Sequence, residues 1–272
     1  MTAVQDITTK SYGALRSGPD DASETFVFLH GWSGSKELWW NTLALLGDAY
    51  QGVALDLPGT GGTPLLAASL SMPSLAEWVC ETVGALGLTG VTLVGHSLGG
   101  NLAAQTALDY PNMVGRLVLV DAALATASLP KRAYWTLSPR WGRAALLAVR
   151  VSALPLTVFG RYVPHTHGGG HWTPYARRTH LYVTRNNDRA LQQQLFALTG
   201  NPLDASHLAR LPMPLLIAHG AKDDIIPAAS ARALADALPE ARLTLFPQAR
   251  HCPMDTEPRA FADALRLFVQ ET

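Results

Sequence analysis

The chain has 272 residues, of which 48% are hydrophobic and only 15% are charged, so it can bury a sizeable core and does not have the composition of a disordered protein. Its 21 basic and 21 acidic residues give a formal net charge of zero, without a run of lysines and arginines. This balance argues against nucleic acid or an anionic membrane as a partner and favours a small, uncharged or amphiphilic molecule.

The sequence lacks the usual signals of secretion, membrane insertion and metal binding. Its first residues, MTAVQDITTKSYGAL, have no basic segment followed by an apolar run, so we expect a cytoplasmic location. The most apolar stretch is interrupted by Arg150 and Pro155, which argues against stable membrane insertion. Cys80 and Cys252 lie in unrelated contexts and predict neither a disulfide nor a metal site. We therefore expect no metal and no cofactor, while the oligomeric state stays open.

Six short apolar, β-branched runs predict strands, and segments with helical spacing separate most of them. This alternation predicts one α/β domain over residues 1–272, with a parallel sheet covered by helices on both faces and ligands at the carboxyl ends of the strands. The predicted strands end at His30, Asp56, Gly95, Asp121, Gly220 and Phe246. The predicted helices run from Lys36 to Leu46, Ser74 to Leu86, Leu98 to Tyr110, Ala228 to Leu238 and Pro258 to Val269.

The alternation breaks over residues 122–211, which are aromatic-rich and punctuated by prolines. We interpret this segment as a helical cap inserted into a core of residues 1–121 and 212–272. Its aromatic side chains could roof an apolar cavity over the strand ends, although most of them are expected to form the interior of the cap itself.

The stretch LVGHSLGG places Ser97 between a predicted strand and a predicted helix, with glycines two residues to either side. A serine at such a turn is held in a strained backbone conformation, and side chains at Gly95 and Gly99 would collide with the neighbouring strand and helix. The turn would lift the hydroxyl off the sheet, beside the positive end of the helix. The pattern predicts that Ser97 is a nucleophile.

A serine nucleophile needs a base, and the base needs an acid that orients it. The segment GAKDDIIP places Asp223 directly after one predicted strand, and ARHCPMDTEP places His251 directly after the next. The chain order Ser97, Asp223, His251 is the order expected for a nucleophile on a strand-to-helix turn of this kind. We therefore predict that these three residues form a catalytic triad.

Five motifs in order, HGWSG, DLPGTGGT, VGHSLGG, GAKDDIIP and RHCPMDTEP, resemble those of the α/β-hydrolase fold superfamily, in its serine-hydrolase form. The resemblance covers nearly the whole chain outside the cap. It implies an eight-stranded, mostly parallel sheet, a helical cap after the sixth strand and a Ser-His-Asp triad. One departure is GTGGT, where the family more often has a serine after the second glycine; this changes a turn and leaves the chemistry untouched.

An oxyanion hole in this architecture uses the amide that follows the nucleophile and a second amide from the loop after an earlier strand. These are the amides of Leu98 and Trp32. His30, Gly31 and Gly34 are expected to let the loop turn back toward Ser97, and the Trp32 side chain to form a wall of the acyl pocket.

The stretch HTHGGGHW, His165–Trp172, invites two other interpretations. Its His-Gly-Gly-Gly resembles an oxyanion loop, but such a loop precedes the nucleophile, whereas this one lies downstream in the cap. Its three histidines could bind a metal, but the glycines make a converging arrangement hard to hold. We expect a flexible cap loop that gates the cavity.

Other side chains compete for the acid and base roles. Asp224 adjoins Asp223, and Asp121 ends the predicted strand that corresponds to the sixth strand of the family, a position from which some members of the superfamily supply the acid. His96 and His219 are expected to be packed in the interior rather than catalytic, and Asp56 to anchor a turn. Asp223 is the favoured acid.

The predicted function is hydrolysis of a carboxylic ester of a small, largely apolar substrate through an acyl-enzyme intermediate. A serine nucleophile argues against the dehalogenases and epoxide hydrolases of the superfamily, which need a carboxylate in its place. Carbon–carbon bond hydrolysis, lactone hydrolysis, thioester hydrolysis and perhydrolysis with the same triad stay open as alternatives. A non-catalytic ligand receptor is disfavoured, because a receptor could dispense with several of these residues.

Overall fold

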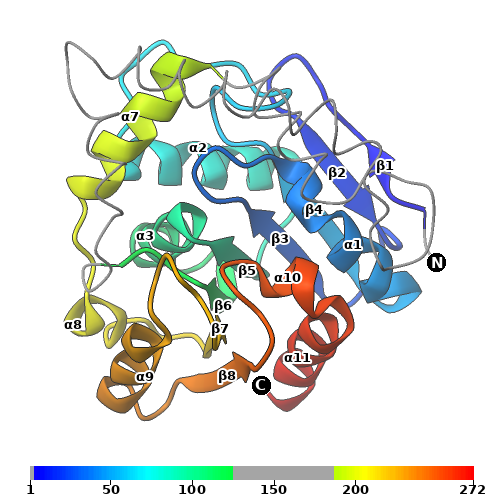
Figure 1. Ribbon diagram of the computed structural model, residues 1–272. Helices are drawn as coiled ribbons and strands as arrows, with labels where there is room; N and C mark the ends of the chain where they lie inside the picture. The colour runs from blue at the N-terminus through cyan, green and yellow to red at the C-terminus, as the bar shows by residue number, and fades with distance from the viewer. Residues whose placement is uncertain (1–2, 125–186) are drawn as a thin grey trace, which may run out of the picture.

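The computed structural model describes residues 3–124 and 187–272, which form an eight-stranded sheet in the order β1-β2-β4-β3-β5-β6-β7-β8 (Figure 1). The first two strands pair antiparallel, as do β2 and β4, and all the remaining pairs are parallel. The strands are β1 (Gln5–Asp6), β2 (Ala14–Ser17), β3 (Thr25–Leu29), β4 (Gln51–Leu55), β5 (Val91–His96), β6 (Val114–Val120), β7 (Leu215–Gly220) and β8 (Arg242–Phe246).

Six of these strands, β3 to β8, are the ones predicted from apolar runs. The antiparallel strands β1 and β2 were not predicted from local pattern, because each is too short to show alternation. They bring the sheet to the eight strands that the family resemblance implies, and the expected fold class is confirmed.

Helices cover both faces of the sheet (Figure 1). One core cluster joins α2, α3 and α9 to one face, and a second joins α1, α10 and α11 to the other. The helices are α1 (Trp40–Leu46), α2 (Met72–Ala85), α3 (Leu98–Asp109), α7 (Asp188–Thr199), α8 (Ala205–Leu208), α9 (Ala228–Ala237), α10 (Pro253–Thr256) and α11 (Pro258–Glu271).

The strand β3 shows why its sequence fits the middle of such a sandwich. Successive side chains of a strand point to opposite faces, so Phe26 and Phe28 pack in the core beneath α1 and α11, whereas Val27 and Leu29 pack in the core beneath α2 and α3. All four side chains are buried. A strand covered on both faces needs apolar residues at every position, which is the pattern of TFVFL.

The predicted helices are present with small changes at their ends. Helix α2 begins at Met72, two residues earlier than predicted, because Ser71 caps it in a reciprocal hydrogen-bonded box with Ser74. The segment predicted as one helix from Lys36 is divided into a 3-10 turn, Lys36–Trp39, and α1.

Of the predicted cap, 122–211, the structure describes residues 122–124 and 187–211. Helices α7 and α8 lie here, and β7 follows them. The aromatic-rich middle of the cap lies outside the described residues, so the cap boundaries stay a prediction. In the described ranges, 3–124 and 187–272, no helix is both long and apolar enough to cross a membrane.

Candidate active site

The turn at Ser97 joins β5 to α3 in a strained backbone conformation. Ser97 has φ 54° and ψ −116°, a combination that residues with a side chain rarely adopt. Its amide donates to the Val120 carbonyl at 2.9 Å, and its own carbonyl accepts from the Gly100 and Asn101 amides at 3.0 and 3.3 Å. These bonds tie the turn to β6 and to the first turn of α3, so the surrounding structure holds the predicted strand–serine–helix turn in place.

The flanking glycines are required by close backbone contacts. A Cβ on Gly95 would lie 2.1 Å from the carbonyl oxygen of Gly99, and a Cβ on Gly99 would lie 2.5 Å from the carbonyl oxygen of His30. Both distances are far inside van der Waals contact. Glycine at these positions therefore lets β3, β5 and α3 converge at the serine, as the sequence pattern predicts.

The loop after β3 lies directly against the serine. A Cβ on Gly31 would be 3.0 Å from the Ser97 Cβ and 2.8 Å from the His96 Nδ1. The Gly34 amide donates to the Gly31 carbonyl at 3.0 Å and closes a tight turn, in which Ser33 has φ 59°. The loop therefore turns back toward Ser97, as expected.

His30 fixes this loop to the loop after β4. Its Nε2 accepts from the Leu57 amide at 3.0 Å, so its Nδ1 carries the proton and donates to the Gly31 carbonyl at 2.7 Å. Burial lowers the pKa of His30, which keeps the imidazole neutral. This residue acts on the structure of the loop and leaves the acid–base role to another histidine.

The two expected oxyanion donors lie in segments that adjoin Ser97. Leu98 is the first residue of α3, where amides have no acceptor within the helix. Trp32 directly follows Gly31, the residue packed against the serine, and its indole Nε1 donates to the Leu191 carbonyl of α7 at 2.8 Å. Oxyanion binding by these amides stays a prediction.

Asp223 and His251 come together from the loops after β7 and β8. His251 Nδ1 donates to Asp223 Oδ2 at 2.8 Å, while Asp223 Oδ1 accepts from the amides of Ile225 and Ile226 at 2.8 and 3.0 Å. Since Nδ1 carries the proton, Nε2 is left as the basic nitrogen. The arrangement is that of an imidazole held in one tautomer by a buried acid.

His251 is positioned beside the residue that precedes the serine. His96 Nε2 donates to the His251 carbonyl at 2.7 Å, and the two rings lie 4.8 Å apart. Within the part of the chain that the structure describes, no hydrogen bond joins the Ser97 hydroxyl to the His251 ring. Such bonds are often long in unliganded sites and shorten when substrate binds.

The two competing acids are in different surroundings. Asp224 is exposed and pairs with Arg250 at 3.1 Å, away from His251. Asp121 is fully buried and accepts from the Gly220 amide at 2.8 Å. Of the three aspartates, the structure joins only Asp223 to His251 by a hydrogen bond among the described contacts.

The electrostatics of the site favour an ionised Asp223. Burial opposes ionisation of its carboxyl, but the hydrogen bond and charge of His251 and the amides of Ile226 and Ile225 outweigh it and hold the pKa below its usual value. Burial lowers the pKa of His219, whose Nε2 donates to the Ile226 carbonyl at 2.9 Å. His96 and His219 are thus packed and hydrogen-bonded to carbonyls, as predicted.

Asn101 is a residue that the sequence reasoning missed. Its Nδ2 donates to the carbonyls of Ala123 and Asn201, both at 3.1 Å, and its Oδ1 accepts from Asn201 Nδ2 at 2.9 Å. Asn101 therefore joins α3 to Ala123, which precedes residues 125–186, and to Asn201, which follows them. An amide side chain four residues after Ser97, on the buried side of an apolar helix, was the available signal.

Asp56 anchors a turn, as predicted, and does so with a buried lysine that was not predicted. Asp56 Oδ1 accepts from the Lys36 amide at 2.8 Å, and Oδ2 accepts from Lys36 Nζ at 3.0 Å and from the Gly62 amide at 2.8 Å. The pair joins the segment after β3 to the loop after β4.

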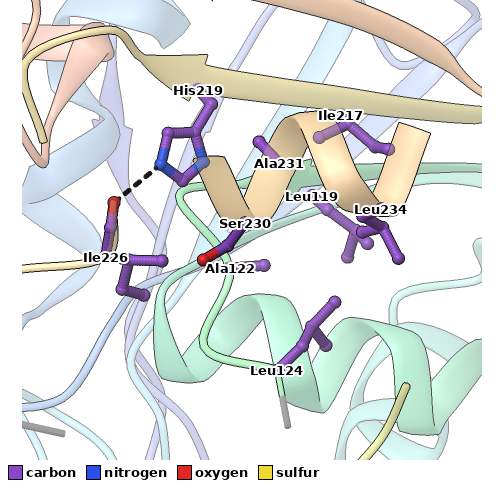
Figure 2. A pocket seen from close by; sticks show the side chains of 9 residues that line it. All are labelled: Leu119, Ala122, Leu124, Ile217, His219, Ile226, Ser230, Ala231 and Leu234. Atoms are coloured by element: carbon purple, nitrogen blue, oxygen red, sulfur yellow. Dashed lines mark hydrogen bonds between the residues drawn. The ribbon is translucent and has the colours of Figure 1, made fainter. Parts of the chain in front are cut away.

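A small cavity of about 20 Å³ lies between the ends of β6 and β7 and helix α9, with room for about one water molecule. Figure 2 shows apolar side chains around it and His219 at its edge, with its hydrogen bond directed to Ile226. Its lining residues are Leu119, Ala122, Leu124, Ile217, His219, Ile226, Ser230, Ala231 and Leu234.

The three histidines of HTHGGGH lie outside the described residues, so neither the gating loop nor a metal there is tested. Within the described part, two groups of side chains have donor atoms close enough to surround an ion: Asp121 with His96 and His251, and Asp121 with His219 and Asp223. Most of these side chains already make the hydrogen bonds described above.

The comparison with protein families agrees with this geometry. The family model described as alpha/beta hydrolase fold matches residues 24–258. The chain therefore belongs to the α/β-hydrolase fold family, and the resemblance drawn from the five motifs is confirmed.

The proteins to which this chain is similar include esterases and a dienoate hydrolase. The chain is 28% identical to a pimeloyl-[acyl-carrier protein] methyl ester esterase of Nitrosomonas europaea, over 90% of this chain and 93% of the relative. Carboxylesterase CesB of Bacillus subtilis matches with a TM-score of 0.74 at 20% identity, covering 100% of this chain and 93% of that one. The 2-hydroxy-6-oxo-6-phenylhexa-2,4-dienoate hydrolase of a Rhodococcus strain matches with a TM-score of 0.77 at 19% identity, covering 99% and 100%. These structural matches show the fold.

Proposed function

We propose that this α/β hydrolase cleaves a carboxylic ester of a small, largely apolar substrate through an acyl-enzyme intermediate. The observation that carries the proposal is the hydrogen bond from His251 Nδ1 to the buried Asp223, beside a strained serine turn. Because Nδ1 is bonded to Asp223, His251 Nε2 is left as a base, and the His251 ring lies 4.8 Å from the ring of His96, the residue before Ser97. The relationship to an ester hydrolase along nearly the whole chain supports the choice of reaction.

In the proposed mechanism, Ser97 Oγ attacks the ester carbonyl while His251 Nε2 takes the hydroxyl proton. Asp223 holds the imidazole in its tautomer and stabilises the imidazolium that forms. The amides of Trp32 and Leu98 donate to the oxyanion, an interaction worth about 3 kcal/mol for each donor. His251 then protonates the leaving alkoxide, and a water molecule activated by the same imidazole releases the acid. These steps need no cofactor or metal.

A fluorophosphonate probe tests the nucleophile. The native protein is expected to gain the mass of one phosphonyl group on the peptide that contains Ser97, and Ser97→Ala should gain none. A folded native protein that stays unlabelled would refute the serine mechanism.

A substrate panel tests the reaction class. The panel contains p-nitrophenyl esters of increasing acyl length, a lactone, a thioester and a dienone. We expect the highest kcat/KM on an ester of short or medium acyl chain, because the weakly charged, apolar-rich composition of the chain favours a small, largely apolar substrate. Faster cleavage of the dienone would instead indicate carbon–carbon bond hydrolysis with the same triad. A cytoplasmic location and a helical cap over residues 122–211 stay predictions from sequence.

A further inference from the structure

Two carboxyl groups meet in the buried base of the proposed site. Asp121 directly follows β6 and Asp223 follows β7, and a carboxylate oxygen of each lies within 4.8 Å of the other, beside His219. Asp121 is fully buried and has φ 43°, in the left-handed region that disfavours a residue with a side chain. Its amide donates to the Ala218 carbonyl at 3.0 Å, so the backbone fixes the carboxyl in this position.

The hydrogen bonds of the pair leave one oxygen without a partner. Asp223 accepts from two amides through Oδ1 and from His251 through Oδ2. Asp121 accepts from the Gly220 amide through Oδ1, whereas its buried Oδ2 has no hydrogen-bond partner within residues 3–124 and 187–272 as long as both carboxyls are ionised. A proton on Asp121 Oδ2 would give this oxygen a partner, because the neighbouring carboxylate of Asp223 could accept it.

The histidines around the pair do not neutralise it. His219 Nε2 lies 3.5 Å from Asp121 and 3.6 Å from Asp223, but its proton is donated to the Ile226 carbonyl. His96 donates its Nε2 proton to the His251 carbonyl. In the described part of the chain, the ion-pair partners of these two aspartates are histidines alone. Two buried carboxyls this close together, with no lysine or arginine paired to them among the described residues, strongly disfavour a full charge on both.

We propose that Asp121 is a neutral carboxylic acid whose Oδ2–H donates a hydrogen bond to the Asp223 carboxylate, which makes it a positioning residue for the acid of the triad. The pair then holds one proton and one negative charge, and Asp223 is fixed by four donors. Burial raises the pKa of Asp121 well above its usual value, and the neighbouring Asp223 adds to the rise. The role in positioning rests on the proposed function, whereas the protonation state can be measured without it.

Infrared spectroscopy tests the protonation state directly. The difference spectrum between the native protein and Asp121→Asn at neutral pH should contain the C=O band of one protonated carboxylic acid. A difference spectrum with carboxylate bands instead would overturn the proposal. Because this readout needs no turnover, it stands even if the Ser97 peptide takes up no fluorophosphonate, the result that would refute the serine mechanism.

Kinetics test the positioning role. Asp121→Leu removes the donor and should slow fluorophosphonate labelling of Ser97 by about tenfold to a hundredfold, the value of a hydrogen bond to a charged group. Asp121→Asn presents an N–H at the same place and should restore most of that rate. The exposed Asp224→Asn is the matched control and should label like the native protein.

The pH profile separates a neutral Asp121 from a charged one. His96, His219, Asp223 and His251 face Asp121 from β5, β7 and the two following loops. If Asp121 is neutral, the labelling rate should fall on the acid side at the same pH in Asp121→Asn as in the native protein. A fall that occurs at lower pH in Asp121→Asn would show that the substitution had removed a negative charge that stabilises the His251 imidazolium. That result would overturn the proposal.

Discussion

At the scale of single residues, Asp223 is the best-defined member of the candidate site. One carboxylate oxygen is held by two backbone amides and the other by His251, so the side chain has little freedom to rotate. Sequence spacing predicted this residue, because the end of a parallel strand is where such an acid belongs. The neighbouring Asp121 was considered only as a rival. Its contact with Asp223 could not be predicted, because it depends on how the ends of β6 and β7 are aligned.

Replacement of Asp223 should reveal its role. Asp223→Asn should lower kcat by about a thousandfold to ten-thousandfold, because an amide can hold the imidazole in the wrong tautomer and cannot stabilise the imidazolium. Ester hydrolysis measured beside Asp224→Asn and Asp121→Asn gives the comparison. A larger loss for Asp224→Asn than for Asp223→Asn would contradict the assignment.

The buried Lys36 gives a second prediction at this scale, this time for stability. Its Nζ lies 3.0 Å from Asp56 Oδ2, and both side chains are almost completely buried. Lys36→Met would leave the Asp56 carboxylate buried without its cation, which should lower the free energy of unfolding by about 3 to 5 kcal/mol in urea titrations. The exposed Lys10→Met serves as the control and should unfold at nearly the native urea concentration. Equal midpoints for both variants would refute this role of the pair.

At the scale of secondary-structure elements, the strand-to-helix turn could be predicted from sequence in some detail. A strand, one serine and a helix with two spaced glycines leave few alternatives, and Gly95 and Gly99 make the contacts that the pattern requires. The link between Trp32 and the Leu191 carbonyl of α7 could not be predicted, because the two residues are far apart in sequence. The same holds for the bond between Asn101 and Asn201.

A matched pair of glycine replacements tests the packing of the turn. Gly99→Ala would force a methyl group to within 2.5 Å of the His30 carbonyl and should cost about 3 kcal/mol of stability. Gly84 lies within α2, and a Cβ added there would meet no atom within 4 Å outside the adjacent helix backbone. Gly84→Ala should therefore stabilise the protein by about 0.5 to 1 kcal/mol. Thermal unfolding of the two variants should therefore move in opposite directions, and a tolerated Gly99→Ala would contradict the close approach.

At the scale of the whole molecule, the order of elements along the chain was enough to predict a parallel sheet between two helical layers. The edge formed by β1 and β2 was missed, because strands of two and four residues carry almost no periodicity. The packing of this edge depends on long-range pairing with β4, which a local pattern does not contain.

The stability of the folded molecule should depend on pH through two buried histidines. Burial lowers the pKa of both His30 and His219 below the value of 6.5 that the unfolded chain retains. The unfolded state therefore binds these protons first as the pH falls, so the stability that the two neutral histidines contribute is fully present above pH 6.5 and is lost below it. Each histidine can contribute up to about 1.4 kcal/mol per pH unit.

Urea unfolding measured from pH 7.5 down to pH 5 checks this dependence. The native protein should lose stability steadily below pH 6.5. His30→Gln should be less stable at pH 7, because it loses the fit between two loops, but should show a shallower decline. A decline in His30→Gln that is as steep as in the native protein would contradict the neutral state of the His30 imidazole.

The side chain of Asn101 binds the chain just after it leaves β6, at Ala123, and again between α7 and α8, at Asn201. The two ends of the intervening stretch are thus fastened to one point on the helix of the nucleophile. Since lengthening a connection whose ends are already fixed adds little entropic cost, stretches of very different length can be exchanged there during evolution without disturbing the reaction chemistry. Substrate range in such a scaffold can diversify by replacement of that one connection.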